Sequence, residues 1–209
     1  MQIFPRSINR LPAVAAVALA LITGGAVFIV WYYFSPLNTQ VGYAPHQPVP
    51  YSHRLHAGQL GIDCRYCHTN VERSVVAMVP PTQTCMNCHA LVKADSAKLA
   101  PVRESWATGK PIEWVRVHRL PDHAYFDHSV HVTAGVGCVE CHGRVDQRDV
   151  VAQAKPLSMS WCLDCHRDPG PRLRPKDQVT NMEWARKDDE PIKLARPVDP
   201  PKHCSGCHR

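Results

Sequence analysis

The sequence predicts a mostly irregular chain in which short α-helices wrap around several large bound groups, behind one N-terminal transmembrane helix. Three observations support this fold class. The pattern Cys-x-x-Cys-His occurs five times and uses all ten cysteines of the 209-residue chain. Nineteen prolines disfavour long helices and sheets. One long apolar stretch without charged residues lies near the N-terminus.

The repeated pattern is the attachment signature of c-type haem. Its two thiols bond the haem vinyl groups, and the adjacent histidine ligates the iron from the proximal side. Zinc sites, redox dithiols and disulfide frameworks also use paired cysteines. None of them predicts a histidine after the second cysteine in all five copies.

We therefore expect a multihaem cytochrome c with five covalently bound haem c groups, and no catalytic residue. The expected attachment cysteines are Cys64, Cys67, Cys85, Cys88, Cys138, Cys141, Cys162, Cys165, Cys204 and Cys207. The expected proximal ligands are His68, His89, His142, His166 and His208.

The N-terminal segment is expected to anchor the chain in a membrane. Residues 1–10 form a basic N-terminus, and residues 11–34 are apolar and long enough to cross a bilayer. The basic flank stays in the cytoplasm, so the haem domain lies in the periplasm of a bacterial inner membrane. A cleaved signal peptide is the alternative. The apolar core runs on into Trp31–Phe34 without a small-residue cleavage site, which favours a retained anchor.

The rest of the chain divides into a linker, two repeated modules, a spacer and an arm. Residues 35–50 are a proline-rich linker. An aromatic residue, two histidines three residues apart, a glycine-bearing turn and then the haem signature occur twice, and another signature follows each copy. We therefore expect di-haem modules at residues 51–92 and 125–170, which resemble each other as an internal duplication.

Between the modules, residues 93–124 are a spacer that contains a predicted helix within 93–112. Ser96 precedes this helix, Pro101 fits its first turn, and Gly109 ends it. Residues 171–209 form a charged, proline-rich arm that carries the fifth signature. Such an arm either reaches towards a partner protein or folds back on the modules.

The second axial ligand of each iron decides whether a haem only carries electrons or also binds a substrate. Eight histidines lie outside the signatures, which is more than five distal positions require. The expected distal ligands are His53, His56, His128, His131, His118 and His123. Weaker candidates are Met182, Met159, Met78, His46 and His203. With all five irons saturated, the chain is an electron carrier.

The formal charge of +6 does not indicate nucleic-acid binding. Five haems bring ten propionates, and the lysines and arginines supply much of the countercharge.

Several longer strings carry a family resemblance. The repeated Phe/Tyr-x-His-x-x-His units resemble class III multihaem cytochromes c. HRLHAGQLGIDCRYCHTNVE, PPTQTCMNCHALVK, WVRVHRLPDHAYFDHSVHV and GVGCVECHGRVDQRDVV resemble the pentahaem, membrane-anchored cytochrome c subunit of alternative complex III.

This resemblance implies an electron-relay subunit of a respiratory quinol-oxidising complex, which is not an enzyme on its own. Electrons would pass towards a periplasmic cytochrome c or a terminal oxidase. The implied partners are an iron–sulfur subunit like molybdopterin oxidoreductases, polytopic quinol-binding subunits, and a monohaem cytochrome c or terminal oxidase.

Two other functions stay open at this point. A free-standing, membrane-anchored multihaem quinol dehydrogenase would need a haem close to the bilayer, which the long linker opposes. A multihaem reductase would need an open iron, often marked by a lysine in place of the signature histidine. All five signatures here end in histidine.

Overall fold

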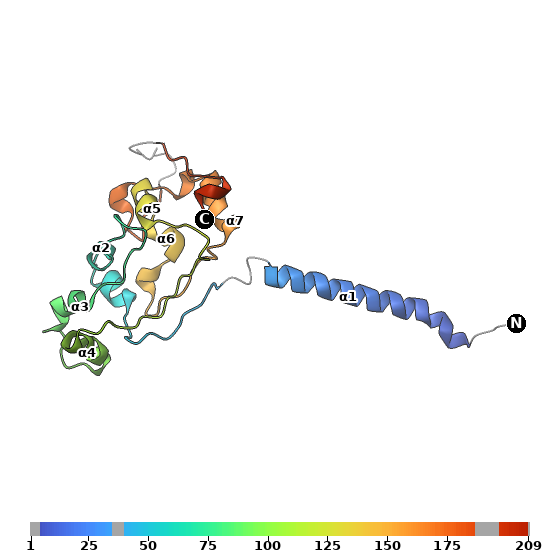
Figure 1. Cartoon of the computed structure of the whole chain (residues 1–209), viewed down its shortest axis with the longest axis horizontal. Coiled ribbons are helices and arrows are strands. Elements are labelled where there is room, and N and C mark those ends of the chain that lie inside the picture. Colours follow the sequence, from blue (N-terminus) through green and yellow to red (C-terminus); the bar gives the residue numbers. More distant parts are fainter. Residues whose placement is uncertain (1–4, 35–39, 187–196, 209) are drawn as a thin grey trace. The chain divides into compact units, whose positions relative to one another are not determined.

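The computed structural model describes residues 5–34, 40–186 and 197–208 (Figure 1). Residues 1–4 of the predicted N-terminus, 35–39 of the linker, and 187–196 and 209 of the arm lie outside the described residues. The chain divides into two compact units, residues 1–39 and residues 40–209, and each is described by itself.

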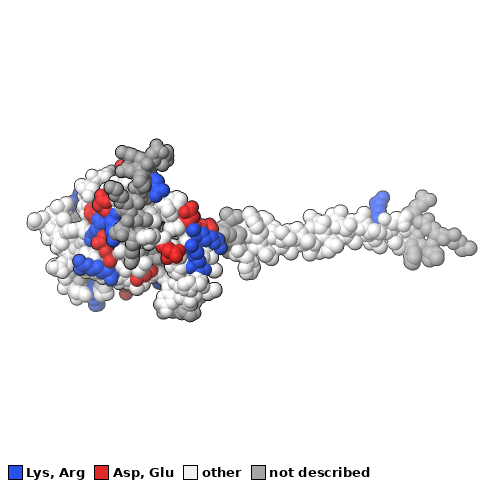
Figure 2. Space-filling view, turned by 90° about the horizontal axis from the view of Figure 1, so that it is seen from above, with Lys and Arg blue, Asp and Glu red and all other residues white. Residues whose placement is uncertain are grey.

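The first unit is one long helix. α1 spans Leu11–Phe34 and follows the short 3-10 turn η1, Arg6–Arg10. Twenty-four residues at about 1.5 Å each exceed the ~30 Å hydrocarbon thickness of a bilayer. Within the helical stretch Ser7–Phe34, an 18-residue window has a mean hydropathy of 2.5, and none of that window is buried. Figure 2 shows no charged side chain along this helix until its basic N-terminal end. Its length and composition fit a membrane anchor, and a signal sequence has the same properties.

The second unit consists of short helical segments and irregular chain. Among the residues that the structure describes there is no β-strand, and the only β-pairing is two isolated bridges, Ala124 with His208 and Val136 with Leu173. Every signature lies on a helical turn. These turns are α2 (Cys64–Cys67), α3 (Thr82–His89), α6 (Cys138–His142), α7 (Met159–Arg167) and η8 (Cys204–Gly206).

The two repeated segments share their local structure and differ by one residue. In the second copy, α5 spans His128–Ala134 and ends at Gly135, whose φ is 95°. In the first copy, the equivalent segment η3, Arg54–Gln59, is a π-helical turn that leads to Gly61, with φ 68°. The first copy has one residue more between its second histidine and this glycine. A π turn holds one residue more than an α turn, so it accommodates the insertion and keeps the signature in register.

The spacer helix is present but shorter than predicted. The 3-10 turn η4, Ala97–Leu99, leads into α4, Ala100–Thr108. Pro101 lies in the first turn of α4, and Gly109 ends it with φ 71°. Ser96 precedes the turn, but its side chain makes no capping hydrogen bond. The Thr82 and Ser105 hydroxyls lie 2.7 Å apart and join α4 to α3.

The described parts of the arm fold back on the modules. The 3-10 turns η6, Gly170–Arg172, and η7, Lys176–Gln178, flank a segment in which Leu173 and Arg174 are 2% and 3% exposed. The Tyr125 backbone N–H donates to the Cys207 carbonyl at 2.6 Å, which joins the fifth signature to the start of the second module. The arm is therefore part of the body over its described residues.

Gly135 and Gly61 occupy equivalent positions of the repeat and make a matched pair of test sites. A Cβ at Gly61 meets no atom within 4 Å, whereas a Cβ at Gly135 would lie 2.5 Å from the Arg174 carbonyl oxygen. We expect Gly61→Ala to cost about 1–2 kcal/mol for left-handed backbone, and Gly135→Ala to cost about 1–3 kcal/mol more for overpacking. Thermal unfolding of the haem-loaded chain measures both. Equal losses would contradict the contact between Gly135 and the arm.

Candidate haem-binding sites

The second unit encloses a large cavity where a domain of its size would have a side-chain core. Only five apolar side chains are buried among the described residues: Val49, Val102, Ala152, Leu173 and Val179. The cavity has a volume of about 3010 Å³, and the cysteines and histidines of all five signatures line it. An ordinary cofactor pocket holds about 300–1,000 Å³. The space therefore fits several large groups side by side.

The cysteines are arranged as pairs of free thiols. None of the ten forms a disulfide, and no three His, Cys, Asp or Glu side chains of the described residues gather as a metal-binding cluster. Burial, with the charges of Cys165 and Glu140, raises the pKa of Cys141 to about 12. Burial also raises the pKa of Cys85 and of Cys67, the latter with help from neighbouring thiols. Thiols that stay neutral, as these three do, fit thioether attachment better than a zinc site, which needs thiolates.

The same kind of hydrogen bond orients most of the histidines. In seven of them the ring Nδ1 lies within hydrogen-bond distance of a backbone carbonyl. A carbonyl can only accept, so Nδ1 carries the proton and Nε2 keeps a lone pair for a metal. The pairs are His56 with Ser52, His68 with Met78, His89 with Val92, His128 with Val75, His131 with Asp127, His166 with Pro201, and His208 with His123.

The two modules use the second histidine of each pair in the same way. The His56 ring lies 6.1 Å from the His89 ring, and the His131 ring lies 6.1 Å from the His166 ring, between centroids. Two metal–imidazole bonds of about 2.0 Å each, plus the ring radii, place the centroids of a bis-histidine iron site about 6 Å apart. Both pairs therefore have the spacing of two axial ligands on one iron.

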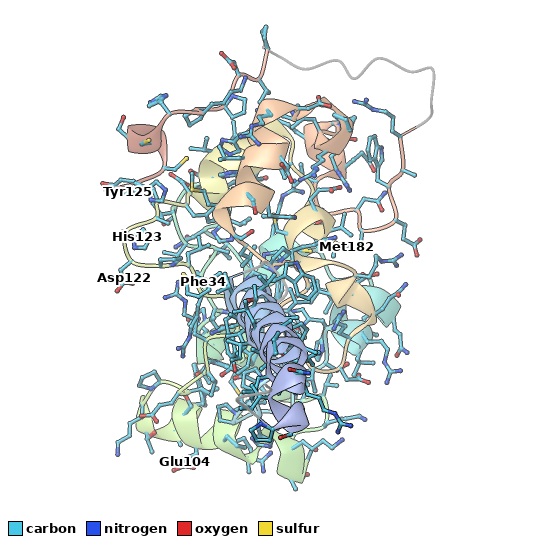
Figure 3. The ribbon with its side chains drawn as sticks, turned by 90° about the vertical axis from the view of Figure 1, so that its right-hand side faces the viewer. Phe34, Glu104, Asp122, His123, Tyr125 and Met182 are labelled. Carbon is cyan, nitrogen blue, oxygen red and sulfur yellow. The ribbon has the colours of Figure 1, made fainter. Side chains whose placement is uncertain are left out.

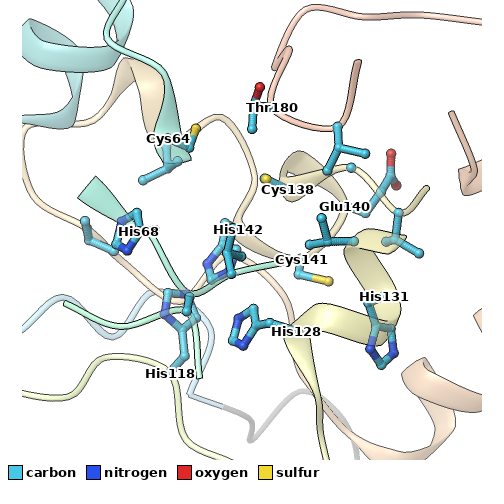
Figure 4. Close-up of a pocket in the computed structure, with 18 of the residues that line it drawn as sticks. Cys64, His68, His118, His128, His131, Cys138, Glu140, Cys141, His142 and Thr180 are labelled. Atoms are coloured by element: carbon cyan, nitrogen blue, oxygen red, sulfur yellow. The ribbon is translucent and has the colours of Figure 1, made fainter. Parts of the chain in front are cut away.

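Two histidines lie close to His142, but only one has axial spacing (Figure 4). The His128 ring is nearly parallel to that of His142, at 6.4 Å and 10°. The His118 ring stands edge-on to it at 4.5 Å, which leaves no room for an iron between them. Burial and the imidazoles of His118, His128, His68 and His53 lower the pKa of His142 to about 3. His142 is thus held neutral, as a metal ligand must be.

His53 belongs with the first signature. Burial and then the nearby charges of His68 and His56 lower its pKa to about 4. Its Nδ1 is buried and has no hydrogen-bond partner, and the same is true of Nε2 of His118. Buried polar nitrogens normally have partners. Two orphaned imidazole nitrogens beside the cavity therefore favour a bound group there.

The fifth signature meets His123 rather than a methionine. The His123 and His208 rings stack with centroids 5.5 Å apart. Figure 3 shows Met182 well away from His123. Met159 begins α7 and is 62% exposed. The backbone carbonyl of Met78 accepts the hydrogen bond from the His68 ring, and the Met78 sulfur accepts a hydrogen bond from the Asn70 side chain. His46 and His203 also line the cavity.

Sequence reasoning missed the backbone carbonyls that orient the rings and a buried arginine, Arg174, beside the third signature. The carbonyls have no sequence signal, because any residue supplies one. For Arg174 the available signal was Gly137, immediately before Cys138, where a Cβ would lie 2.2 Å from the guanidinium carbon.

Comparisons with known proteins find relatives among the cytochromes c. Residues 124–209 match the family described as "Cytochrome c7 and related cytochrome c". The chain is 31% identical over 117 residues to "Menaquinone reductase, multiheme cytochrome c subunit" of Nitratidesulfovibrio vulgaris (strain Hildenborough), which covers 56% of this chain and 53% of that protein. This chain therefore spans about half the length of the curated relative that it matches. Over these segments it is related to multihaem cytochromes c.

An aromatic ring stacks on the second histidine in both modules. Tyr51 lies 4.5 Å from His56 at 21°, and Phe126 lies 4.6 Å from His131 at 29°. We expect Phe126→Ala to cost about 3 kcal/mol through lost packing and to broaden the electron paramagnetic resonance signal of one low-spin iron. Tyr51→Phe keeps the stacked ring and should leave the five signals unchanged. An unchanged spectrum and melting temperature in Phe126→Ala would contradict this role.

Proposed function

We propose that this chain binds five c-type haems and relays electrons as a membrane-anchored subunit of a quinone-linked respiratory complex. When bound, each haem would supply an iron that gains and loses one electron. The observation that carries the proposal is the series of contacts through which the five signatures follow one another around one cavity. We number the signatures one to five in chain order.

The first and second signatures touch directly. The Asn87 side chain of the second donates to the Tyr66 hydroxyl of the first at 3.1 Å. The Tyr51 ring contacts both histidines of the pair, at 4.8 Å from His53 and 4.5 Å from His56. Within this module, His56 faces the second signature, and the charge of His68 in the first signature helps to lower the pKa of His53.

The first and third signatures join the two modules. The Cys64 and Cys138 thiols interact, since each is the largest cause of the shift in the other's pKa, and Figure 4 shows both in the same pocket. The segment around Val179 holds both signatures: the Thr180 hydroxyl donates to Asp63 at 2.8 Å, and the Cys138 N–H donates to the Val179 carbonyl at 3.1 Å.

The third, fourth and fifth signatures complete the series. On α5, His128 faces His142 and His131 faces His166. The His166 ring donates to the Pro201 carbonyl of the arm at 2.8 Å. The thiol of Cys207 contributes to the raised pKa of Cys162. The order in space is therefore second, first, third, fourth, fifth, which differs from the order in the chain and suits an electron relay.

The chain's own residues would hold and saturate the irons. The proposed axial pairs are His68 with His53, His89 with His56, His142 with His128, His166 with His131, and His208 with His123. Backbone carbonyls orient seven of these ten rings, which would keep the ligands in place as each iron changes its charge. His118 would remain beside His142 outside the axial position.

Two partner settings are consistent with this relay. The resemblance to the pentahaem subunit of alternative complex III favours quinol oxidation, with electrons leaving towards a cytochrome c or terminal oxidase. The relative from N. vulgaris is named a menaquinone reductase subunit, which favours delivery of electrons towards menaquinone. In both settings α1 serves as the anchor, and the second unit lies in the periplasm.

Carbon monoxide tests ligand saturation. We expect no shift of the Soret band when the dithionite-reduced protein is exposed to the gas, because two imidazoles would hold each iron. His128→Ala should open one iron and give a shift equivalent to one haem in five. His118→Ala is the matched control, and carbon monoxide should not shift the Soret band of this variant. A shift in the wild type would contradict the relay, and a shift in His118→Ala would reverse the axial assignment.

Gentle solubilisation of the membranes tests the complex. We expect the haem-stained band on a native gel to contain an iron–sulfur subunit and polytopic membrane proteins. The direction of electron flow then follows from two assays. Reduction of the haems by added quinol indicates quinol oxidation, and oxidation of the reduced haems by added quinone indicates quinone reduction. A band holding only this chain would instead indicate a free-standing dehydrogenase.

A further inference from the structure

Arg174 is a charged side chain placed in the interior beside the third signature. It is 3% exposed and lines the large cavity. Its guanidinium donates to Glu140 at 2.8 Å and to the Asn181 carbonyl at 3.0 Å, and it lies 5.0 Å from the Trp184 ring centroid. The Nε atom is buried without a partner. A buried charge is expensive to maintain, so its place here calls for an explanation.

Glu140 brings the opposite charge to the same signature. It lies between Cys138 and Cys141 on α6, is 29% exposed, and lines the cavity (Figure 4). Gly137 admits the arginine, since a Cβ there would lie 2.2 Å from the guanidinium carbon. Both charges therefore lie next to the third signature: Glu140 is part of it, and Arg174 packs against the glycine that precedes it.

We propose that buried Arg174 and half-buried Glu140 are a charge pair that sets the reduction potential of the haem held at Cys138 and Cys141, an inference that rests on the proposed haem at that signature. The ferric centre carries one positive charge more than the ferrous centre. A nearby guanidinium disfavours the ferric form and raises the potential, whereas a nearby carboxylate does the reverse. Charge burial and hydrogen bonding are established means of tuning haem potentials.

The alternative is that the pair only fastens the arm to the module. Arg174 does take part in that contact, because its backbone N–H donates to the Gly135 carbonyl at 2.8 Å. The two roles differ in the sign of their effects. If the pair only fastens the arm, removal of either side chain lets water reach the site and shifts the potential in the same direction. Loss of one charge from a tuning pair shifts the potential in opposite directions for the two partners.

The test is a redox titration of the full haem-loaded chain, fitted with five one-electron transitions. We expect Arg174→Gln to lower one of the five potentials and Glu140→Gln to raise the same one. A tenfold change in the ferric-to-ferrous ratio corresponds to 59 mV for one electron, and each single variant should move by about that amount. The double variant Arg174→Gln/Glu140→Gln should return towards the wild-type value.

Two further variants keep the test decisive. Arg174→Lys retains the positive charge and should hold the potential near the wild-type value even if Arg174→Gln fails to mature. Arg103→Gln is the control, because Arg103 donates to the Ala94 and Ser96 carbonyls and does not line the cavity. Shifts of both single variants in one direction, or no shift in either, would overturn the tuning role. Absence of haem at the third signature in the wild type would instead refute the proposed function.

Discussion

The structure depends on one constraint: the second unit buries too few apolar side chains to hold itself together. Five buried apolar residues in the described chain are far fewer than a domain of this length needs. The missing apolar contacts have to come from whatever fills the 3010 Å³ cavity that the signatures line. We therefore expect folding and haem loading to be coupled in this unit, as metal binding and folding are in small metalloproteins. Five of its short helical segments carry a signature, and the signature is the part of each that a bound group would hold.

Given that constraint, the histidine rings need an anchor that does not depend on a packed core. Backbone carbonyls provide it. In both modules the second histidine of the pair donates to the carbonyl four residues earlier, Ser52 for His56 and Asp127 for His131. These bonds form within one helical turn, so they persist wherever the turn forms. The longer-range bonds of His128 with Val75 and of His166 with Pro201 add the connections between modules and between module and arm.

The local features were predictable from sequence, and the long-range ones were not. Short helical turns at the signatures, the helix that ends at Gly109 and the glycines after the histidine pairs all follow from nearby residues, and the structure has them. The π turn at Arg54–Gln59 also follows from the one-residue insertion, although only the comparison of both copies makes this visible. The spatial order of the signatures was hidden, because contacts such as Asp63 with Thr180 join residues 117 apart. Arg174 was hidden for the same reason, since its partner Glu140 is 34 residues away.

The spatial order gives the third signature a special position. It is the middle site of the proposed series, with two signatures on either side. A change of potential at an end site alters exchange with one partner protein, whereas a change at the middle alters passage in both halves of the series. The pair of Arg174 and Glu140 lies at this middle site, and its two charges act in opposite senses. The balance of the two charges would set how easily an electron passes the middle site, in either direction. The direction of net flow is fixed by the potentials of the donor and the acceptor, so quinol oxidation and menaquinone reduction are both compatible with this arrangement of attachment sites, and the difference between them would lie in the partner proteins.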